Sequence, residues 1–358
     1  MKVLLLGDYS GLGSTLKEGL LQLGVDVVLA SNGDGWKNIQ GGDTFLFPND
    51  GTNFISRKSN HMLFPRKDKR FCGYDVVQCP GTDIFSWSTG TKPFDNLMKN
   101  NNKFFINAAG VDCYLYDSWK NHKLKYDYYM FDDNPDLEKW LGGNNISSFM
   151  RNRRCRKIMK KADGIIPVIP YEYEISYEGF TNLRKAIVLP INVDKYKYLP
   201  NIVEKRIIFF HGINRIYDKG SDLIKKAMIR AQKMYPKDIE CIIAERMPFD
   251  EYTQNIERAN VIIDQCKSYG YGMNALISMA KGKVVFSGAE KEVISRISSE
   301  DCPVVNIRPD EEQIYAQIMS LIEKKTEILD MGLHSREYVF KYHNYIDVAK
   351  KYLETWCE

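Results

Sequence analysis

Residues 2–30 read KVLLLGDYSGLGSTLKEGLLQLGVDVVLA, and this stretch decides the fold class. It opens with a continuous apolar run, Lys2–Leu6, which predicts a buried strand, and continues through a glycine-containing turn. A helix is expected to begin near Ser14, because leucines follow it at spacings of four and three residues. The helix ends at Gly24, and Val25–Ala30 is the next apolar strand. A strand–helix–strand unit with fully apolar strands predicts a parallel sheet with helices on both faces.

The same alternation recurs along the rest of the chain. Further strands are predicted at residues 74–79, 103–107, 164–168 and 186–189. After a linker at Pro190–Pro200, strands are predicted at residues 207–211, 240–244, 261–263, 284–286 and 304–307. Helices are predicted between these strands at residues 221–235, 252–259 and 271–281. The sequence therefore predicts an α/β protein with two Rossmann-like, doubly wound parallel-sheet domains facing a cleft, at residues 1–195 and 196–335.

The composition fits this prediction and excludes other classes. With 358 residues, 44% of them hydrophobic, the chain is too long for one ordinary core and too apolar for disorder. A formal net charge of +4 gives no reason to expect a nucleic acid partner, and apolar runs such as Val3–Leu6 are too short to span a membrane. Eight cysteines without Cys-x-x-Cys spacing, and an N-terminal apolar run that ends early, favour reduced thiols in a cytoplasmic protein.

The stretch HGINRIYDKG, residues 211–220, lies between a predicted strand and a predicted helix. Arg215 and Lys219 therefore precede a helix N-terminus, where free N–H groups and the helix dipole attract anions. Arginine can bind phosphate oxygens in pairs and lysine adds a point charge, so a diphosphate fits, although two solvated loop cations are as plausible. The candidate binding residues here are His211, Gly212, Asn214, Arg215, Lys219 and Gly220.

The stretch DQCKSYGYGMN, residues 264–274, also follows a predicted strand and opens a helix. Its glycines would let the backbone approach a ligand closely, although a glycine turn with a capping carboxylate is the ordinary alternative. The candidate residues here are Asp264, Gln265, Tyr269, Gly270, Tyr271, Gly272, Met273 and Asn274. The dinucleotide fingerprint Gly-x-Gly-x-x-Gly is absent here and after the first strand, which argues against a dehydrogenase.

Three further stretches have the order and spacing of a known family: KADGIIPV at 161–168, VLPINVD at 188–194 and MAKGK at 279–283. With the two stretches above, they resemble the GT-B glycosyltransferases related to the large retaining family 4, most clearly over residues 160–290. In this resemblance Arg215 and Lys219 match the residues that hold the donor diphosphate. The first loop resembles the family's acceptor-side loop, with Asp8, Ser10, Gly11 and Gly13 as its residues.

The sequence departs from the family at several positions. The glutamate that binds the donor ribose is Ile277 here, its frequent partner aligns near Tyr269, and Val284 replaces a proline. An apolar isoleucine cannot accept a hydrogen bond from ribose, so either another group does this, with Asp264 and Glu290 as candidates, or donor binding is weaker or altered. Where some members carry a histidine loop, this chain has Asn107–Asp112, and Asp112 is the candidate polar group near the reacting sugar.

The resemblance implies transfer of a sugar from a nucleoside-diphosphate sugar, of the UDP or GDP type, to a hydroxyl of a glycan or lipid-linked acceptor. Arg215 and Lys219 would stabilise the leaving diphosphate, so neither a metal nor another cofactor is expected. Retention of configuration, synthesis of a surface polysaccharide and base readout near Glu245 are implied by the resemblance alone. So is a C-terminal helix, residues 336–358, that packs back on the first domain.

Two other functions stay open. The same fold carries nucleotide-sugar epimerases and phosphorylases, which would keep the diphosphate site. A homologue without catalytic activity is the third hypothesis, and Ile277 is its main support.

Two charged stretches have weaker interpretations. Cations at residues 151, 153, 154, 156, 157, 160 and 161 fit a solvated helix better than a helix bound to anionic lipid, so peripheral contact with the inner face of a membrane is the minor alternative. Asp132–Asn134 imitates a metal motif of another glycosyltransferase fold, but a solvated turn is the preferred interpretation.

Overall fold

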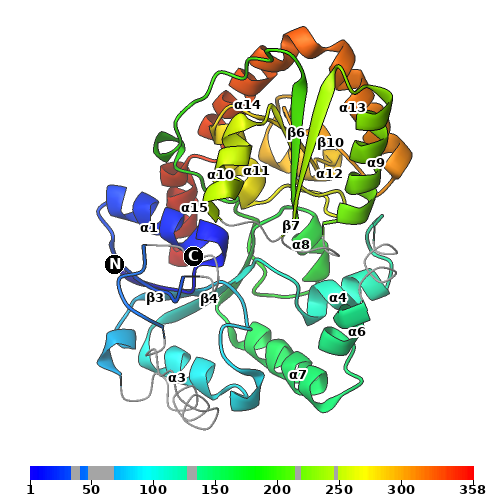
Figure 1. Ribbon diagram of the computed structural model, residues 1–358. Helices are drawn as coiled ribbons and strands as arrows, with labels where there is room; N and C mark the ends of the chain where they lie inside the picture. The colour runs from blue at the N-terminus through cyan, green and yellow to red at the C-terminus, as the bar shows by residue number, and fades with distance from the viewer. Residues whose placement is uncertain (34–40, 47–67, 127–134, 214–218, 246–248) are drawn as a thin grey trace. The chain divides into compact units, whose positions relative to one another are not determined.

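The computed structural model describes residues 1–33, 41–46, 68–126, 135–213, 219–245 and 249–358. These residues form two compact units (Figure 1). The first unit contains the described residues of Met1–Lys123, together with Pro135–Pro190 and Tyr345–Glu358. The second contains residues 124–126 and the described residues of Ile191–Asn344. The last helix of the chain therefore belongs to the first unit, and a short piece of the first half belongs to the second.

The described part of the first unit contains one parallel five-stranded sheet, in the order β2-β1-β3-β4-β5. Its strands are β1 (Lys2–Leu6), β2 (Asp26–Ala30), β3 (Val76–Cys79), β4 (Lys103–Ala108) and β5 (Gly164–Pro167). The inner strand β1 is apolar on both faces, and Val3 and Leu4 are fully buried. Burial on both faces explains why this strand is a continuous apolar run in the sequence.

Helices cover both faces of this sheet. They are α1 (Leu12–Gln22), α3 (Lys92–Asn100), α4 (Cys113–Lys120), α6 (Pro135–Leu141), α7 (Ile146–Lys161), α8 (Glu172–Ser176) and α15 (Tyr345–Cys357). In Figure 1, α1 and α15 lie on one face, and α3 and α7 lie on the other. The α1–α15 contact is close, because a Cβ placed on Gly19 would lie 2.3 Å from the Tyr345 carbonyl oxygen.

The second unit repeats the same topology. In its described residues the parallel strands have the order β10-β9-β8-β6-β7. They are β6 (Ile207–Ile213), β7 (Ile239–Glu245), β8 (Val261–Ile263), β9 (Val284–Ser287) and β10 (Val305–Asn306). In each sheet, the first strand in sequence pairs with the second strand on one side and with the third strand on the other side. Each unit is therefore doubly wound.

Two helix layers enclose the second sheet. The helices are α9 (Ser221–Met234), α10 (Phe249–Arg258), α11 (Met273–Ala280), α12 (Lys291–Ile297), α13 (Glu311–Glu323) and α14 (Ile328–Tyr342). Figure 1 shows α9 beside α13, while α10, α11 and α14 lie on the opposite face. Fully buried Phe209, Val261 and Phe286 are in the core between the sheet and the α9 layer. Short 3-10 helices are η1 (Tyr9–Gly11), η3 (Lys69–Phe71), η4 (Trp87–Thr89), η5 (Val193–Lys195) and η6 (Lys325–Glu327).

These observations confirm the predicted α/β class with two parallel sheets and correct three details. The strand predicted at 186–189 is wrong: Ile187 donates one hydrogen bond to the Pro167 carbonyl oxygen (2.9 Å), and Pro167 has no N–H group to return one. Residues 336–358 are not one helix but the end of α14 and α15, because the His343 carbonyl accepts from Ile191 N–H (2.8 Å) instead of continuing the helix. In the charged run, Arg154 is buried rather than solvated.

Within the described residues, no helix has both the length and the apolar character that crossing a bilayer requires.

Candidate functional site

Each sheet has a switch point, where the strand order reverses, and ligands of such sheets bind beyond the carboxyl ends of the strands at this point. In the first unit it lies between β1 and β3, and in the second between β6 and β8. Most of the described candidate residues follow these strands.

A buried ion pair forms the centre of the second site. Lys219 Nζ lies 2.6 Å from Asp264 Oδ1, and Asn274 Nδ2 donates to the same carboxylate at 2.9 Å. Burial alone would raise the pKa of Asp264, but the charge and hydrogen bonds of Lys219 and Asn274 outweigh it and lower the pKa. The structure therefore brings together three candidate residues, of which Lys219 and Asn274 are 55 residues apart in the sequence.

His211 is fixed beside this pair as a neutral side chain. Its Nδ1 lies 2.7 Å from the Ile263 carbonyl oxygen and its Nε2 lies 3.0 Å from Ser221 Oγ. Burial lowers the pKa of His211 to about 4, so the ring is uncharged at neutral pH. His211 is therefore a packed, hydrogen-bonded side chain that joins β8 to the start of α9.

The N-terminus of α11 is open toward solvent. Its N-cap, Gly272, has an extended backbone, and a Cβ placed there would meet no atom within 4 Å. No side chain caps the helix, and its first turn contains no acidic residue. Unpaired N–H groups with no competing carboxylate at the N-cap favour an anion at this position.

The start of α9 differs from that of α11. Gly220 has φ of +70°, and a Cβ placed on it would lie 2.3 Å from Cys266 Sγ. Gly212 is equally restricted, since its Cβ would lie 2.3 Å from the Tyr252 ring. These two glycines are thus required by packing, whereas Gly272 leaves space for a ligand.

Tyr269 and Glu290 form a separate cluster with residues 124–126. The Tyr269 hydroxyl accepts from Lys125 N–H at 2.6 Å, and Glu290 accepts from the Tyr126 hydroxyl at 2.6 Å and from Arg308 Nε at 2.9 Å. Burial opposes the charge of Glu290, but these hydrogen bonds lower its pKa to about 2. Both candidates for the ribose acceptor are therefore already paired within the chain, Glu290 in this cluster and Asp264 with Lys219 and Asn274.

The remaining candidates of the second unit have varied positions. Gln265 donates to the Gly270 carbonyl oxygen (3.0 Å), which closes the loop before α11. The Tyr271 hydroxyl lies 3.0 Å from His343 Nε2, and Met273 is buried as the first residue of α11. Glu245 ends β7 and pairs with Lys225 at 3.0 Å. Asn214 and Arg215 lie outside the described residues, as do residues 246–248 and Asp132–Asn134.

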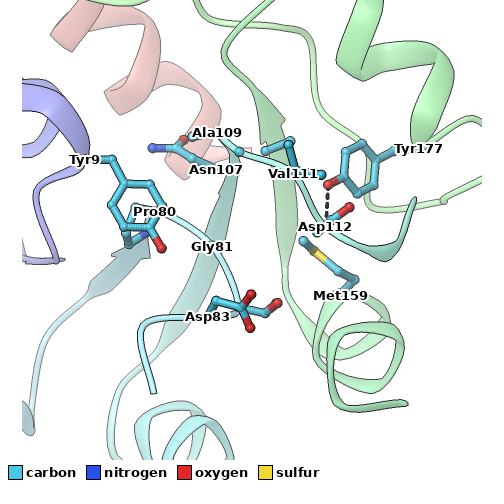
Figure 2. Close-up of a pocket in the computed structure, with 13 residues that line it drawn as sticks. Tyr9, Pro80, Gly81, Asp83, Asn107, Ala109, Val111, Asp112, Met159 and Tyr177 are labelled. Atoms are coloured by element: carbon cyan, nitrogen blue, oxygen red, sulfur yellow. Dashed lines mark hydrogen bonds between the residues drawn. The ribbon is translucent and has the colours of Figure 1, made fainter. Parts of the chain in front are cut away.

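The first unit contains a pocket at its own switch point (Figure 2). Tyr9 follows β1, residues 80–83 follow β3, and residues 107–112 are the end of β4 and the loop after it. Figure 2 shows Tyr9 and Asn107 on one side, Asp112 and Tyr177 on the other, and Asp83 between them. The lining thus combines carboxylate, amide and hydroxyl groups with a tyrosine ring, a set that suits a polar, hydroxyl-bearing ligand.

Asp112 lines this pocket and also caps α4. Its carboxylate accepts from Tyr114 N–H (2.8 Å), from Leu115 N–H (3.1 Å) and from the Tyr177 hydroxyl (2.6 Å). Burial raises the pKa of Asp112, although these hydrogen bonds act in the opposite direction. Asp112 is therefore held rigidly at the pocket wall.

The acceptor-side loop has a clear structural role. Asp8 accepts from Gly13 N–H (2.8 Å) and Ser14 N–H (3.2 Å), so its carboxylate occupies the N-terminus of α1. Ser10 has φ of +53° and Gly11 has φ of +89°, which form the tight turn before the helix. In contrast to α11, this helix N-terminus already carries a negative charge and disfavours a phosphate ligand.

Sequence reasoning missed Tyr9, Asp83 and Tyr252. Asp83 receives hydrogen bonds from Arg154 (2.7 Å) and Arg151 (2.9 Å), and the Tyr252 hydroxyl donates to Asn274 at 2.9 Å. Asp83 follows a correctly predicted strand, so the rule that polar residues after strands line the site would have found it. Tyr252 has no such signal, because only the fold brings α10 beside α11.

The described residues contain no group of three His, Cys, Asp or Glu side chains arranged to hold a metal ion. All eight cysteines lie in the described chain, and none is in a disulfide.

Comparison with protein-family profiles and with curated sequences finds no match. Solved structures do match over the whole chain. Sucrose-phosphate synthase from Thermosynechococcus elongatus superposes with a TM-score of 0.64 at 12% identity, covering 100% of this chain and 98% of that chain. This chain has the GT-B fold.

Two further structures share the fold. Anabaena HepE, in complex with UDP and glucose, gives a TM-score of 0.59 at 10% identity, covering 100% of this chain and 99% of that chain. UDP-GlcNAc 2-epimerase from Neisseria meningitidis, bound to UDP-GlcNAc, gives 0.53 at 12% identity and covers 100% of both chains. The predicted GT-B architecture is confirmed, while membership of retaining family 4 stays a prediction.

Proposed function

We propose that this chain is a glycosyltransferase that moves a sugar from a nucleoside-diphosphate sugar to an acceptor hydroxyl. The proposal is supported by the GT-B fold, and HepE in complex with UDP and glucose favours a UDP-type donor over a GDP-type donor. A role in polysaccharide synthesis and retention of configuration belong to the same proposal and rest on the sequence resemblance. Free cysteines support action in a reducing compartment such as the cytoplasm.

The observation that carries the proposal is the pairing of an open helix N-terminus with a charged network at the same switch point. The first turn of α11 offers N–H groups, and Gly272 leaves space beside them. Lys219 has three N–H donors, of which the structure assigns one to Asp264. When the bond between the sugar and the diphosphate breaks, negative charge grows on the leaving oxygen, and these groups would stabilise it without a metal.

Arg215 remains a proposal from the sequence, as a second cation on the same diphosphate.

The first unit supplies the proposed acceptor site. Its pocket carries Asp83, Asn107 and Asp112, and the N-terminus of α1 is neutralised by Asp8. Asn107 and Asp112 can accept hydrogen bonds from hydroxyl groups, and Asp8 disfavours a phosphate at the start of α1, so the proposed acceptor is an uncharged sugar. The acceptor oxygen would form the new bond to the sugar carbon as the bond between that carbon and the diphosphate breaks, and its proton would pass to the leaving diphosphate.

The direct experiment is incubation of the chain with radiolabelled UDP-glucose, UDP-GlcNAc and GDP-mannose, with and without a panel of oligosaccharides. Label transferred to an acceptor, together with release of the nucleoside diphosphate, supports the proposal. Release of diphosphate with no labelled glycan in any arm indicates hydrolysis only, and no release in any arm contradicts the proposal.

A second candidate function is epimerisation of a nucleotide sugar, which the likeness to UDP-GlcNAc 2-epimerase favours. The same incubation without acceptor separates the two, because an epimerase forms an isomeric nucleotide sugar or its elimination product. Binding of a nucleotide without any turnover would support the third hypothesis, a non-catalytic homologue.

A further inference from the structure

The outer face of α7 is unlike an ordinary solvated helix surface. We define this face by residues that share one side of the helix at spacings of three and four: Ile146, Phe149, Met150, Arg153, Lys157 and Lys160. The opposite side packs into the first unit through buried Ser148, Cys155, Ile158 and Met159. The helix is therefore fixed in rotation, and its outer face is presented to solvent by the fold itself.

The first turn of this face is apolar and exposed. Ile146 has 78% of its surface accessible and Phe149 has 56%. Single exposed apolar residues are common, but two large ones at adjacent positions of one face lack the usual polar cover. Because the capping box of Asn145 and Ser148 fixes the start of α7, these side chains cannot turn inward by fraying of the helix.

The rest of the face is cationic. Arg153, Lys157 and Lys160 are exposed, and α7 contains no acidic residue from Ile146 to Lys161. Two cations at the edges are paired, Arg156 with Asp117 and Lys161 with Asp95. In the described part of the chain, none of the three central cations forms an ion pair with a carboxylate, although Lys157 lies near enough to Asp95 to lower its pKa. The charge of this face is therefore only partly balanced by the described residues.

We propose that the outer face of α7 binds an anionic lipid surface, with Ile146 and Phe149 inserted among the acyl chains and the three cations on the headgroups. A helix lying in the membrane interface needs this combination of an apolar end and unpaired cations. Nucleic acid would satisfy the cations but would leave Ile146 and Phe149 without an apolar partner. The proposal concerns attachment only, and it is independent of the reaction proposed above.

The test is cosedimentation of the whole chain with vesicles of phosphatidylcholine, with and without phosphatidylglycerol. We expect binding to require phosphatidylglycerol and to weaken with salt. Replacing all three cations (Arg153→Gln, Lys157→Gln, Lys160→Gln) should lower the partition coefficient on the order of 100-fold. The double variant Ile146→Ala, Phe149→Ala should lower it about ten-fold or more, because burial of these side chains is lost.

The matched control removes the same charge by replacing three other exposed lysines, on α9 and just beyond it: Lys226→Gln, Lys233→Gln and Lys237→Gln. This triple variant should change binding by about two-fold at most. Equal losses in the two triple variants would overturn the proposal, since they would show a general effect of net charge. The proposal would also be overturned if the wild-type chain bound vesicles equally well with and without phosphatidylglycerol. It would be overturned too if the chain bound single-stranded RNA through the same residues but did not bind vesicles.

Discussion

The Lys219–Asp264 pair is the residue-scale feature on which the proposed donor site depends. Both side chains are almost fully buried, so each charge is costly unless the other is present. Asn274 adds a hydrogen bond to the same carboxylate and ties the pair to α11. The pair thus keeps a cation beside the proposed phosphate position while limiting its net charge.

This ion pair predicts that a single variant loses stability and that a double variant recovers most of it. Lys219→Met should lower the free energy of unfolding by about 3 kcal/mol or more, because Asp264 is left buried and unpaired. The double variant Lys219→Met, Asp264→Asn should recover most of that loss yet bind nucleoside diphosphates at least about ten-fold more weakly than wild type. Urea unfolding measures the free energy of unfolding, and calorimetry measures binding of the nucleoside diphosphate. Full recovery of binding in the double variant would show that Lys219 does not belong to the binding site.

His211 predicts how stability depends on pH. Its folded pKa, about 4, is below the ordinary value of 6.5, so the unfolded chain takes up a proton that the folded chain refuses. Stability from this group is therefore complete above pH 6.5 and is lost as pH falls toward 4, by up to about 3 kcal/mol. Unfolding midpoints measured across this range should fall more steeply in wild type than in His211→Gln. If the unfolding midpoints of wild type and His211→Gln fell equally with pH, the assignment of a neutral buried ring would be contradicted.

At the residue scale, the sequence predicted which side chains belong to the candidate sites better than it predicted which side chains contact one another. Lys219 and Asp264 were both identified because each follows a strand, yet their ion pair was not, since sequence position does not show which side chains meet. Asp112 was proposed near the reacting sugar, and its capping of α4 was not foreseen, although an aspartate before a helix is a common cap. Arg215 lies outside the described residues, so its role stays a prediction.

At the scale of elements, the contrast between two helix N-termini organises the proposed function. In the first unit Asp8 fills the start of α1, and in the second unit α11 starts without a capping side chain. The first arrangement disfavours a phosphate and the second favours one. The two units thus share a topology but differ in the charge at these two helix N-termini.

Gly272 provides a test in which stability and binding change in opposite directions. Its backbone is extended and its Cβ position is empty, so Gly272→Asp fits and should stabilise α11 by roughly a few tenths of a kcal/mol. The new carboxylate should weaken binding of a nucleoside diphosphate about ten-fold or more by repulsion. Gly272→Asn, which caps without a charge, is the control. If both variants bind as wild type does, the phosphates do not lie at α11.

Element prediction succeeded where strands are buried on both faces. β8 matches its predicted bounds, Val261–Ile263, and β1 matches Lys2–Leu6, because continuous apolar runs bounded by turns leave little choice. It failed at residues 186–189, where the apolar run is buried but Pro167 on β5 offers no N–H to pair with. The break between α14 and α15 was also missed, since it depends on a hydrogen bond from Ile191, far away in sequence.

At the scale of the whole molecule, the C-terminal helix α15 completes the first unit. Trp356 is buried and donates from Nε1 to Gln78 Oε1 at 2.9 Å, and the Tyr352 hydroxyl donates to Asn107 at 2.9 Å. Asn107 lines the pocket of the first unit, so the last helix of the chain supports the proposed acceptor site directly.

Trp356→Ala should therefore destabilise the first unit selectively. We expect a loss of about 3–5 kcal/mol, from the cavity and from Gln78, whose buried amide oxygen loses its donor. Binding of nucleotide by the second unit should persist in the fraction that stays folded. Unfolding followed by circular dichroism, with nucleotide binding measured at each denaturant concentration, separates the two effects. Simultaneous loss of both signals would mean that the units do not unfold separately.

The account depends most on one claim, that the second unit binds a nucleoside diphosphate sugar at α11 and Lys219. The most direct measurement is calorimetric titration of the whole chain with UDP, GDP and ADP and with their sugar conjugates. We predict saturable binding of one nucleotide family, with UDP the first choice, that is weakened in Gly272→Asp and retained in Gly272→Asn. Absence of binding by every nucleotide, in a chain that is folded by circular dichroism, would contradict the claim and favour a non-catalytic role.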